Sequence, residues 1–343
     1  MKKLLTKFRK KNVDTSSRIT NETVAEHRER ILAGGRRFKY PVQYARHRLV
    51  FNAIIISIVA TIIIGLVGWW QLYLAQNTSA FVYRVTAVLP LPVANVDGQP
   101  VPYSDYLMQY RSAAHYLVQK EQISIKSEDG KRQMQYIKQQ AMQSAVADAY
   151  ANKLAQKLNL SISDGELESS LKLQRQSSDG EVSQQTQDAA VLGLYGWSPD
   201  EYRHVLKNAL LRQKVAYAID DSALKVAESV GSQLKVENSN LQVIADATNA
   251  AGANKVAYGT SGWVKRFNQD GGLALVASTL ERGKTSGVVK STKGDSYYFV
   301  RLLDSNDTQV SYEYIHIPLT TFTNEIEKLD KTGKVNRYIS IPK

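Results

Sequence analysis

Side chains that could do chemistry are few in this sequence, and they are scattered. The five histidines (His27, His47, His115, His204 and His316) lack the spacing of a metal site. The chain has no cysteine, which excludes disulfides, thiolate ligands and a cysteine nucleophile. It also has no GxSxG, Walker or GxGxxG motif. The sequence therefore predicts no metal and no small-molecule cofactor.

His316 lies in the segment VSYEYIHIPL, residues 310 to 319, two positions after Tyr314. The alternation of this segment predicts a strand, and residues two apart lie on the same face of a strand. A single histidine in such a strand usually has its hydrogen bonds satisfied within the sheet. We favour that interpretation for His316 over a catalytic one.

The elements that would position such residues follow a long apolar stretch, Leu49 to Leu74, that contains no charge. At about 1.5 Å per residue it is long enough to cross a hydrocarbon core of about 30 Å. A buried helix of a soluble protein rarely runs this long without a charge. A cleaved signal peptide would have a shorter apolar run and a shorter basic leader. We therefore predict an uncleaved signal anchor, with residues 49–75 as a transmembrane helix.

The charge distribution gives this helix an orientation. Residues 1–50 carry fourteen Lys and Arg but only four acidic residues, so they hold about +10 of the formal net charge of +12. The positive-inside rule places a basic tail, residues 1–48, in the cytoplasm and the rest outside the plasma (inner) membrane. Trp69, Trp70 and Tyr73 would form an aromatic belt at the outer interface. A basic segment beside a membrane helix predicts contact with the lipid bilayer, and we do not expect a nucleic-acid partner.

In the tail we expect one short helix, capped by Asn21 and stopped by Gly34 and Gly35. Residues 76–92 predict a linker stiffened by Pro90 and Pro92. The roughly 270 residues after the span are enough for one large domain or two ordinary ones. A hydrophobic content of 43% and a charged content of 22% are typical of a globular chain.

Residues 93–219 predict a helical domain. They begin with a short strand, an Asp97-Gly98 turn and a helix capped by Ser104. Apolar residues then form a stripe along a helix over residues 131–158. Capping boxes at Ser163 and Ser198 begin two further helices, and the polar segment 177–188 between them predicts a loop.

The opening of this region resembles the N-terminal domain of SurA-type and PrsA-type extracytoplasmic chaperones, which also begins with a strand, an Asn-Gly or Asp-Gly turn and a helix opening Ser-Asp-Tyr. The resemblance runs with gaps from Val93 to Ile219 and implies a chaperone that binds unfolded or newly translocated proteins. The region is also rich in Tyr, Gln and Met, which make adaptable apolar contacts. The alternative for any one of these residues is an ordinary core position.

Residues 220–319 begin with two short helices, one capped by Asp221 and one near Ser239. The segment 259–304 then resembles the second half of a parvulin-type peptidyl-prolyl isomerase (rotamase) domain. Gly262-Trp263-Val264 matches its Leu-Gly-Trp-Phe strand, and Tyr298 to Asp304 match its closing strand. The family's opening strand is missing, and we hypothesise that residues 310–319 replace it. The unit would then be circularly permuted, and 310–317 would pair beside 296–303.

The resemblance implies little catalysis. Both parvulin histidines are replaced, by Tyr298 and Tyr314, and His316 lies nearby. The proline pocket aligns with Gln269, Leu273 and Ser278, and Asn249 and Asn254 are the nearest polar candidates for its Asp or Cys. For peptide binding, the resemblance points to four residues: Trp263, Leu273, Tyr298 and Tyr314.

The sequence thus predicts an α+β protein with one N-terminal transmembrane helix, a SurA-like helical domain, a small parvulin-like α/β domain and a C-terminal extension, residues 320–343. We expect an anchored chaperone or foldase. Two alternatives are an active peptidyl-prolyl isomerase and a non-catalytic scaffold subunit of a membrane complex.

Overall fold

The computed structural model describes residues 20–341 except 40, 178–179, 236–238 and 253–254. The chain divides into two compact units, Met1–Gln71 and Leu72–Lys343. The lysines and arginines of the first nineteen residues lie outside the described part, as does Asn254. Helix and strand are mixed, as the α+β prediction requires.

The first unit contains helix α1 (Asn21–Lys39) and helix α2 (Pro41–Trp69), which a short π-helical turn, η1 (Trp70–Leu74), continues into the second unit. The predicted stop at Gly34 and Gly35 is wrong, since α1 runs through both. A glycine inside a helix costs only about 1 kcal/mol, so it need not end one. The segment His47–Leu74 is long and apolar enough to cross a membrane.

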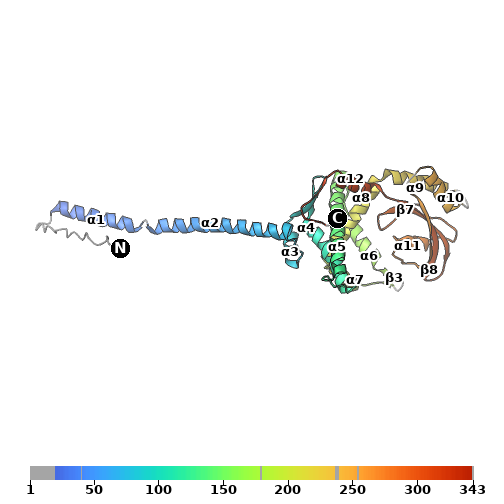
Figure 1. Cartoon of the computed structure of the whole chain (residues 1–343), viewed down its shortest axis with the longest axis horizontal. Coiled ribbons are helices and arrows are strands. Elements are labelled where there is room, and N and C mark those ends of the chain that lie inside the picture. Colours follow the sequence, from blue (N-terminus) through green and yellow to red (C-terminus); the bar gives the residue numbers. More distant parts are fainter. Residues whose placement is uncertain (1–19, 40, 178–179, 236–238, 253–254, 342–343) are drawn as a thin grey trace. The chain divides into compact units, whose positions relative to one another are not determined.

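The helical part of the second unit begins with α3 (Ala80–Val88), β1 (Pro92–Val96) and β2 (Gln99–Pro102). Helices α4 (Tyr103–Gln119) and α5 (Glu128–Leu158) follow and pack side by side (Figure 1). Next come α6 (Asp164–Gln174), a small hairpin of β3 (Gln176–Ser177) and β4 (Gly180–Glu181), α7 (Gln184–Tyr195) and α8 (Pro199–Ile219).

Local signals predicted much of this part. Asp97 and Gly98 both adopt positive φ, +48° and +88°, and they join β1 to β2 as the hairpin that their sequence predicts. Both capping boxes form at Ser163 and Ser198. Ser104 is not a cap, because α4 already begins at Tyr103 after Pro102. The polar loop prediction is wrong as well, since the segment contains a hairpin and the start of α7.

The predicted linker is also wrong. Residues 80–88 form α3, which buries Val82 and Thr86 against the helical domain. The core reaches further back, to Leu72, which is 5% exposed. The Tyr103 hydroxyl donates to the Leu72 carbonyl at 2.7 Å, and the Tyr73 hydroxyl donates to the Pro92 carbonyl at 2.8 Å. The folded domain therefore begins at the last turn of the apolar segment.

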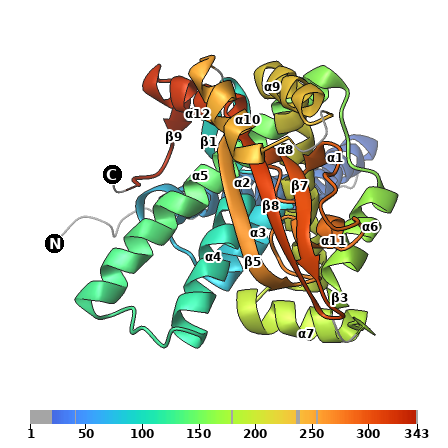
Figure 2. The ribbon, with the colours of Figure 1, turned by 90° about the vertical axis from the view of Figure 1, so that its right-hand side faces the viewer.

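The sheet part contains α9 (Asp221–Gln233), α10 (Leu241–Ala250), β5 (Ala257–Lys265), α11 (Leu273–Ala277), β6 (Val289–Lys290), β7 (Ser296–Ser305) and β8 (Gln309–Pro318). The N-caps of α9 and α10 are Asp220 and Asn240, one residue from the predicted positions. The strand order is β5-β8-β7-β6, all antiparallel. Figure 2 shows β5, β8 and β7 side by side. Residues 310–317 pair with β7, as the permutation hypothesis requires.

Opposite faces of this sheet bury different residues. Tyr297, Phe299, Ile315 and Ile317 face α9 and α10. Val300, Leu302 and Tyr312 pack with α11 on the other face. The alternation along β7 and β8 produces this division.

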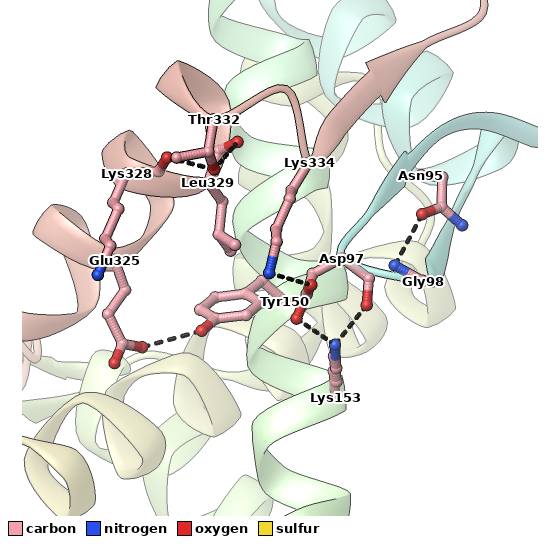
Figure 3. A network of polar contacts seen from close by, with 10 residues as sticks. All are labelled: Asn95, Asp97, Gly98, Tyr150, Lys153, Glu325, Lys328, Leu329, Thr332 and Lys334. Carbon is pink, nitrogen blue, oxygen red and sulfur yellow. Dashed lines mark hydrogen bonds and ion pairs between the residues drawn. The ribbon is translucent and has the colours of Figure 1, made fainter.

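The C-terminal extension returns to the helical part. Helix α12 (Thr321–Lys331) places Phe322 in its core, and β9 (Val335–Arg337) pairs with β1. Asp97 in the β1–β2 turn contacts the ammonium groups of Lys153 and Lys334, at 2.5 and 3.4 Å (Figure 3). Residues from both ends of the second unit thus complete one domain.

Candidate polypeptide-binding cleft

The structure brings three of the predicted site residues together on the α11 face of the sheet. The rings of Tyr298 and Tyr314 lie 5.8 Å apart, and those of Tyr298 and His316 lie 5.0 Å apart. Tyr298 pairs with His316 in the ladder, and Tyr314 pairs with Gly259. A β-carbon at Gly259 would lie 2.7 Å from the Tyr314 ring, so any larger residue there would force this ring to move.

His316 is hydrogen-bonded inside the sheet. Its Nε2 bonds with the hydroxyl of Ser296, which is fully buried. Burial lowers the pKa of His316, and the nearby Asp295 opposes this only in part. A neutral imidazole with a fixed partner is the arrangement of a structural histidine.

The residues aligned with the proline pocket have different surroundings. Leu273, the first residue of α11, is buried in the core between this helix and the sheet, and the Ser278 hydroxyl donates to the Leu275 carbonyl at 2.7 Å. Gln269 lies in the loop before α11 and lines a cleft. A proline ring could not reach Leu273 without displacing core side chains.

Asp270, which the sequence interpretation missed, organises this end of the sheet domain. Its carboxylate accepts hydrogen bonds from the backbone N–H groups of Leu273 and Ala274 and from the Tyr312 hydroxyl at 2.7 Å. Burial and the nearby carboxylate raise the pKa of Tyr312. Asp270 lies two residues before the N-cap, Gly272, so the usual N-cap pattern does not predict this role.

Two further candidates lie apart from Tyr298. Trp263 pairs with Ser311, whose side chain points away from the face of Val310 and Tyr312, and half of the indole is exposed. The Asn249 side chain makes two hydrogen bonds with the backbone of Val256: it donates to the carbonyl at 2.7 Å and accepts from the N–H at 2.8 Å. Asn249 therefore serves the loop after α10.

A cleft of about 740 Å³ lies between the helical part and the sheet part. Helices α6, α7 and α8 form one side, and residues 267–275 with 292–293 form the other, where Figure 1 shows α6 facing α11. Its apolar lining consists of Leu173, Tyr195, Tyr202, Leu206, Leu210, Phe267 and Leu275. Its amide side chains are Gln174, Gln176, Gln187, Gln213, Asn268 and Gln269.

This lining suits an extended polypeptide. Lys293 is the only charged residue among the described residues that line the cleft. Primary amides both donate and accept, so they can pair with peptide N–H and C=O groups of any sequence. The leucine and aromatic side chains can take up apolar side chains. The lining of the cleft therefore presents both amide groups and apolar side chains.

The base of the cleft is held by contacts from α8 to the loop before β7 and to the first residue of β7. Gln213 donates to the Thr292 carbonyl at 2.8 Å, and the Tyr217 hydroxyl donates to the Ser296 carbonyl at 2.7 Å. Gly294 has φ of +71°, and a β-carbon there would lie 2.0 Å from Gln213 Cγ. The two walls meet closely enough here that only glycine fits.

Asp220 joins the two connections that run between the parts. It accepts from the Ala223 N–H at the start of α9 and from the N–H groups of Thr320 and Thr321 at the start of α12. Burial alone would raise the pKa of Asp220, but these hydrogen bonds lower it. One carboxylate thus binds both segments that connect the helical part to the sheet part.

Comparison with known proteins covers the helical part. A family model described as a SurA-like N-terminal domain matches residues 43–216, about half of the chain. The chain belongs to the SurA-like N-terminal domain family. No curated protein and no solved structure matches the chain. Membership indicates a chaperone-type folding factor and agrees with the resemblance seen in the sequence.

The SurA-like match extends from the apolar helix to α8 and ends before the sheet part. It therefore includes α6, α7 and α8, which form one wall of the cleft. The other wall belongs to residues outside the match. Sequence reasoning found the SurA-like helices but missed the cleft, because no local pattern reveals that residues near 174 and 269 will face each other.

Proposed function

We propose that this SurA-like protein is a membrane-anchored extracytoplasmic chaperone or foldase that holds unfolded or extended polypeptide segments in the cleft. The apolar helix would anchor it in the plasma membrane, with the basic tail in the cytoplasm. The observation that carries the proposal is the apolar and amide lining of the cleft, built in part from a SurA-like domain. Anchoring raises the local concentration of clients at the membrane, so modest affinity would suffice.

Leu173 offers a direct test of the cleft. It lines the cleft and is 42% exposed, so Leu173→Gln should leave the fold intact and weaken binding of a reduced, unfolded model client. Leu224 on α9 is 39% exposed and lies away from the cleft, which makes Leu224→Gln the matched control. The measurement is suppression of client aggregation by the full chain in lipid nanodiscs. Equal loss in both variants would contradict a role for the cleft.

For the sheet part we propose a degenerate, permuted parvulin-like domain. The position of β8 between β5 and β7 supports it, since the replacement strand would lie there. Tyr298 and Tyr314 in place of the histidines, and a buried Leu273, favour peptide binding without catalysis. The proposal predicts no acceleration of X-Pro cis/trans exchange in a model peptide. Clear acceleration by the folded chain, lost in Tyr298→Phe, would favour the isomerase alternative.

A further inference from the structure

One face of α3 is apolar and unpartnered although the helix itself is well fixed. The exposed residues Ala80, Phe81, Arg84, Ala87 and Val88 recur at helical spacing and form one stripe. Phe81 is 75% exposed and Val88 is 81% exposed, and Leu89 continues the patch. The stripe has no acidic residue, and its one charge is a cation.

The opposite face of α3 is held in the domain core. Val82 and Thr86 are buried, and the Ser79 hydroxyl accepts from the Val82 N–H at the N-cap. The Arg111 guanidinium lies 5.3 Å from the centre of the Tyr83 ring. The outward stripe is therefore a fixed surface of a folded helix.

The position of α3 along the chain indicates what covers its exposed stripe. Five residues separate Leu74, the last residue of the apolar segment, from Ala80, so α3 begins within about 20 Å of the end of that segment. Leu72 and Val82 belong to the same buried cluster, which brings α3 closer still. Leu74 itself, in the same unit as α3, is 56% exposed.

We propose that the exposed stripe of α3 inserts into the outer lipid headgroup region and fixes the folded domain against the membrane. This inference rests on the proposed membrane anchoring. Phe81 and Val88 would enter the boundary between headgroups and acyl chains, where amphipathic helices lie. Arg84 would extend its charged end toward lipid phosphates while its methylenes stay in the apolar layer. The domain then meets the membrane through two segments, the span and α3.

The absence of cysteine makes a clean test possible, because an introduced cysteine is the only labelling site. Val88→Cys and Phe81→Cys, each in the full chain, carry an environment-sensitive fluorophore in nanodiscs of phosphatidylethanolamine and phosphatidylglycerol. We expect blue-shifted emission that nitroxides placed at shallow depth in the lipid quench. Ile62→Cys reports on the middle of the span and should be quenched by deep nitroxides. Asp307→Cys, in the exposed turn between β7 and β8, is the aqueous control.

Each result decides between the two proposals. If Ile62 is in lipid but the labels on α3 emit as in water, the inference about α3 is wrong and the anchor stands. If Ile62 also emits as in water, both fail. Quenching and a blue shift at α3 that appear only when several copies share one nanodisc would identify a second copy as the occupant and overturn the inference.

Discussion

Removal of residues 71–75 from the folded domain should destabilise it strongly. From the sequence alone, a cut after Ala75 is expected to release a folded fragment, because the apolar segment ends there. The structure instead places Leu72 in the core and gives Tyr103 and Tyr73 backbone partners at Leu72 and Pro92. We therefore compare a fragment 71–343 with a fragment 76–343.

Three losses determine the size of the effect. Emptying the space of a buried leucine such as Leu72 costs about 2 to 5 kcal/mol. The buried Tyr103 hydroxyl loses its acceptor, at about 1 to 3 kcal/mol, and the Tyr73 bond is worth about 1 kcal/mol. Together the fragment should lose about 4 to 9 kcal/mol, which is much of the 5 to 15 kcal/mol that stabilises a typical domain.

Urea unfolding followed by tryptophan fluorescence, from Trp197 and Trp263, measures this loss. We expect a cooperative transition for 71–343 and a far lower midpoint, or no folded baseline, for 76–343. Leu72→Ala in the longer fragment should reproduce the larger share of the loss and controls for fragment length. Equal midpoints for the two fragments would refute the placement of the domain boundary at Leu72.

Three further predictions concern the same unit. Burial raises the pKa of Asp148 to about 6, although its carboxylate lies 2.7 Å from Arg212. The folded state then binds this proton more tightly than the unfolded state. Ionisation of Asp148 in the folded state therefore lowers the free energy of unfolding. This loss is absent below about pH 4 and rises to about 3 kcal/mol above pH 6. Asp148→Asn should therefore stabilise the unit at pH 7.5 with a gain that vanishes by pH 4, and a lower urea midpoint at pH 7.5 would contradict this. Deletion of residues 332–343 removes β9 and should cost about 3 to 6 kcal/mol through the loss of two buried aliphatic side chains, measured by urea unfolding, with an unchanged midpoint as the opposing result. Gly294→Ala should cost about 1 to 3 kcal/mol, because alanine disfavours positive φ and its β-carbon meets Gln213. It should also weaken client binding, and wild-type affinity with normal stability would count against a rigid base of the cleft.

Sequence patterns predicted the local structure best where a side chain acts on its own neighbours. The capping boxes at Ser163 and Ser198 and the Asp97-Gly98 turn form as expected. The wrong prediction of a helix end at Gly34 and Gly35 also has a local cause, since glycine weakens a helix but does not have to end it. Short-range rules therefore describe short-range structure.

Contacts between distant segments could not be predicted in this way. Residues 80–88 of the predicted linker form α3 because Val82 packs into the helical core. Most of that core comes from residues outside the linker, so the linker sequence alone does not reveal this contact. The extension had no assigned role until β9 paired with β1, about 240 residues earlier. Residues 310–317 do pair with β7 as predicted, but these strands are consecutive and joined by a short turn, so this contact is not a distant one.

In the candidate site, too, local placement was predictable and contacts between distant segments were not. Tyr298, Tyr314 and His316 lie on one face of the sheet, because alternation along paired strands fixes the side of each residue. It could not show that Ser296 binds His316, or that Gln269 would face α6 across a cleft. These relations depend on how the helical and sheet parts pack.

Site-specific photo-crosslinking to an unfolded client tests the central claim most directly. A photoreactive residue replaces Leu173 or Phe267, which line opposite walls of the cleft, in the full chain in nanodiscs. Leu224 on α9 and Leu303 on β7 are exposed leucines away from the cleft and serve as controls. Binding in the cleft predicts client adducts from both cleft positions and few from the controls. Equal adducts at all four positions, or adducts at the controls alone, would contradict the account.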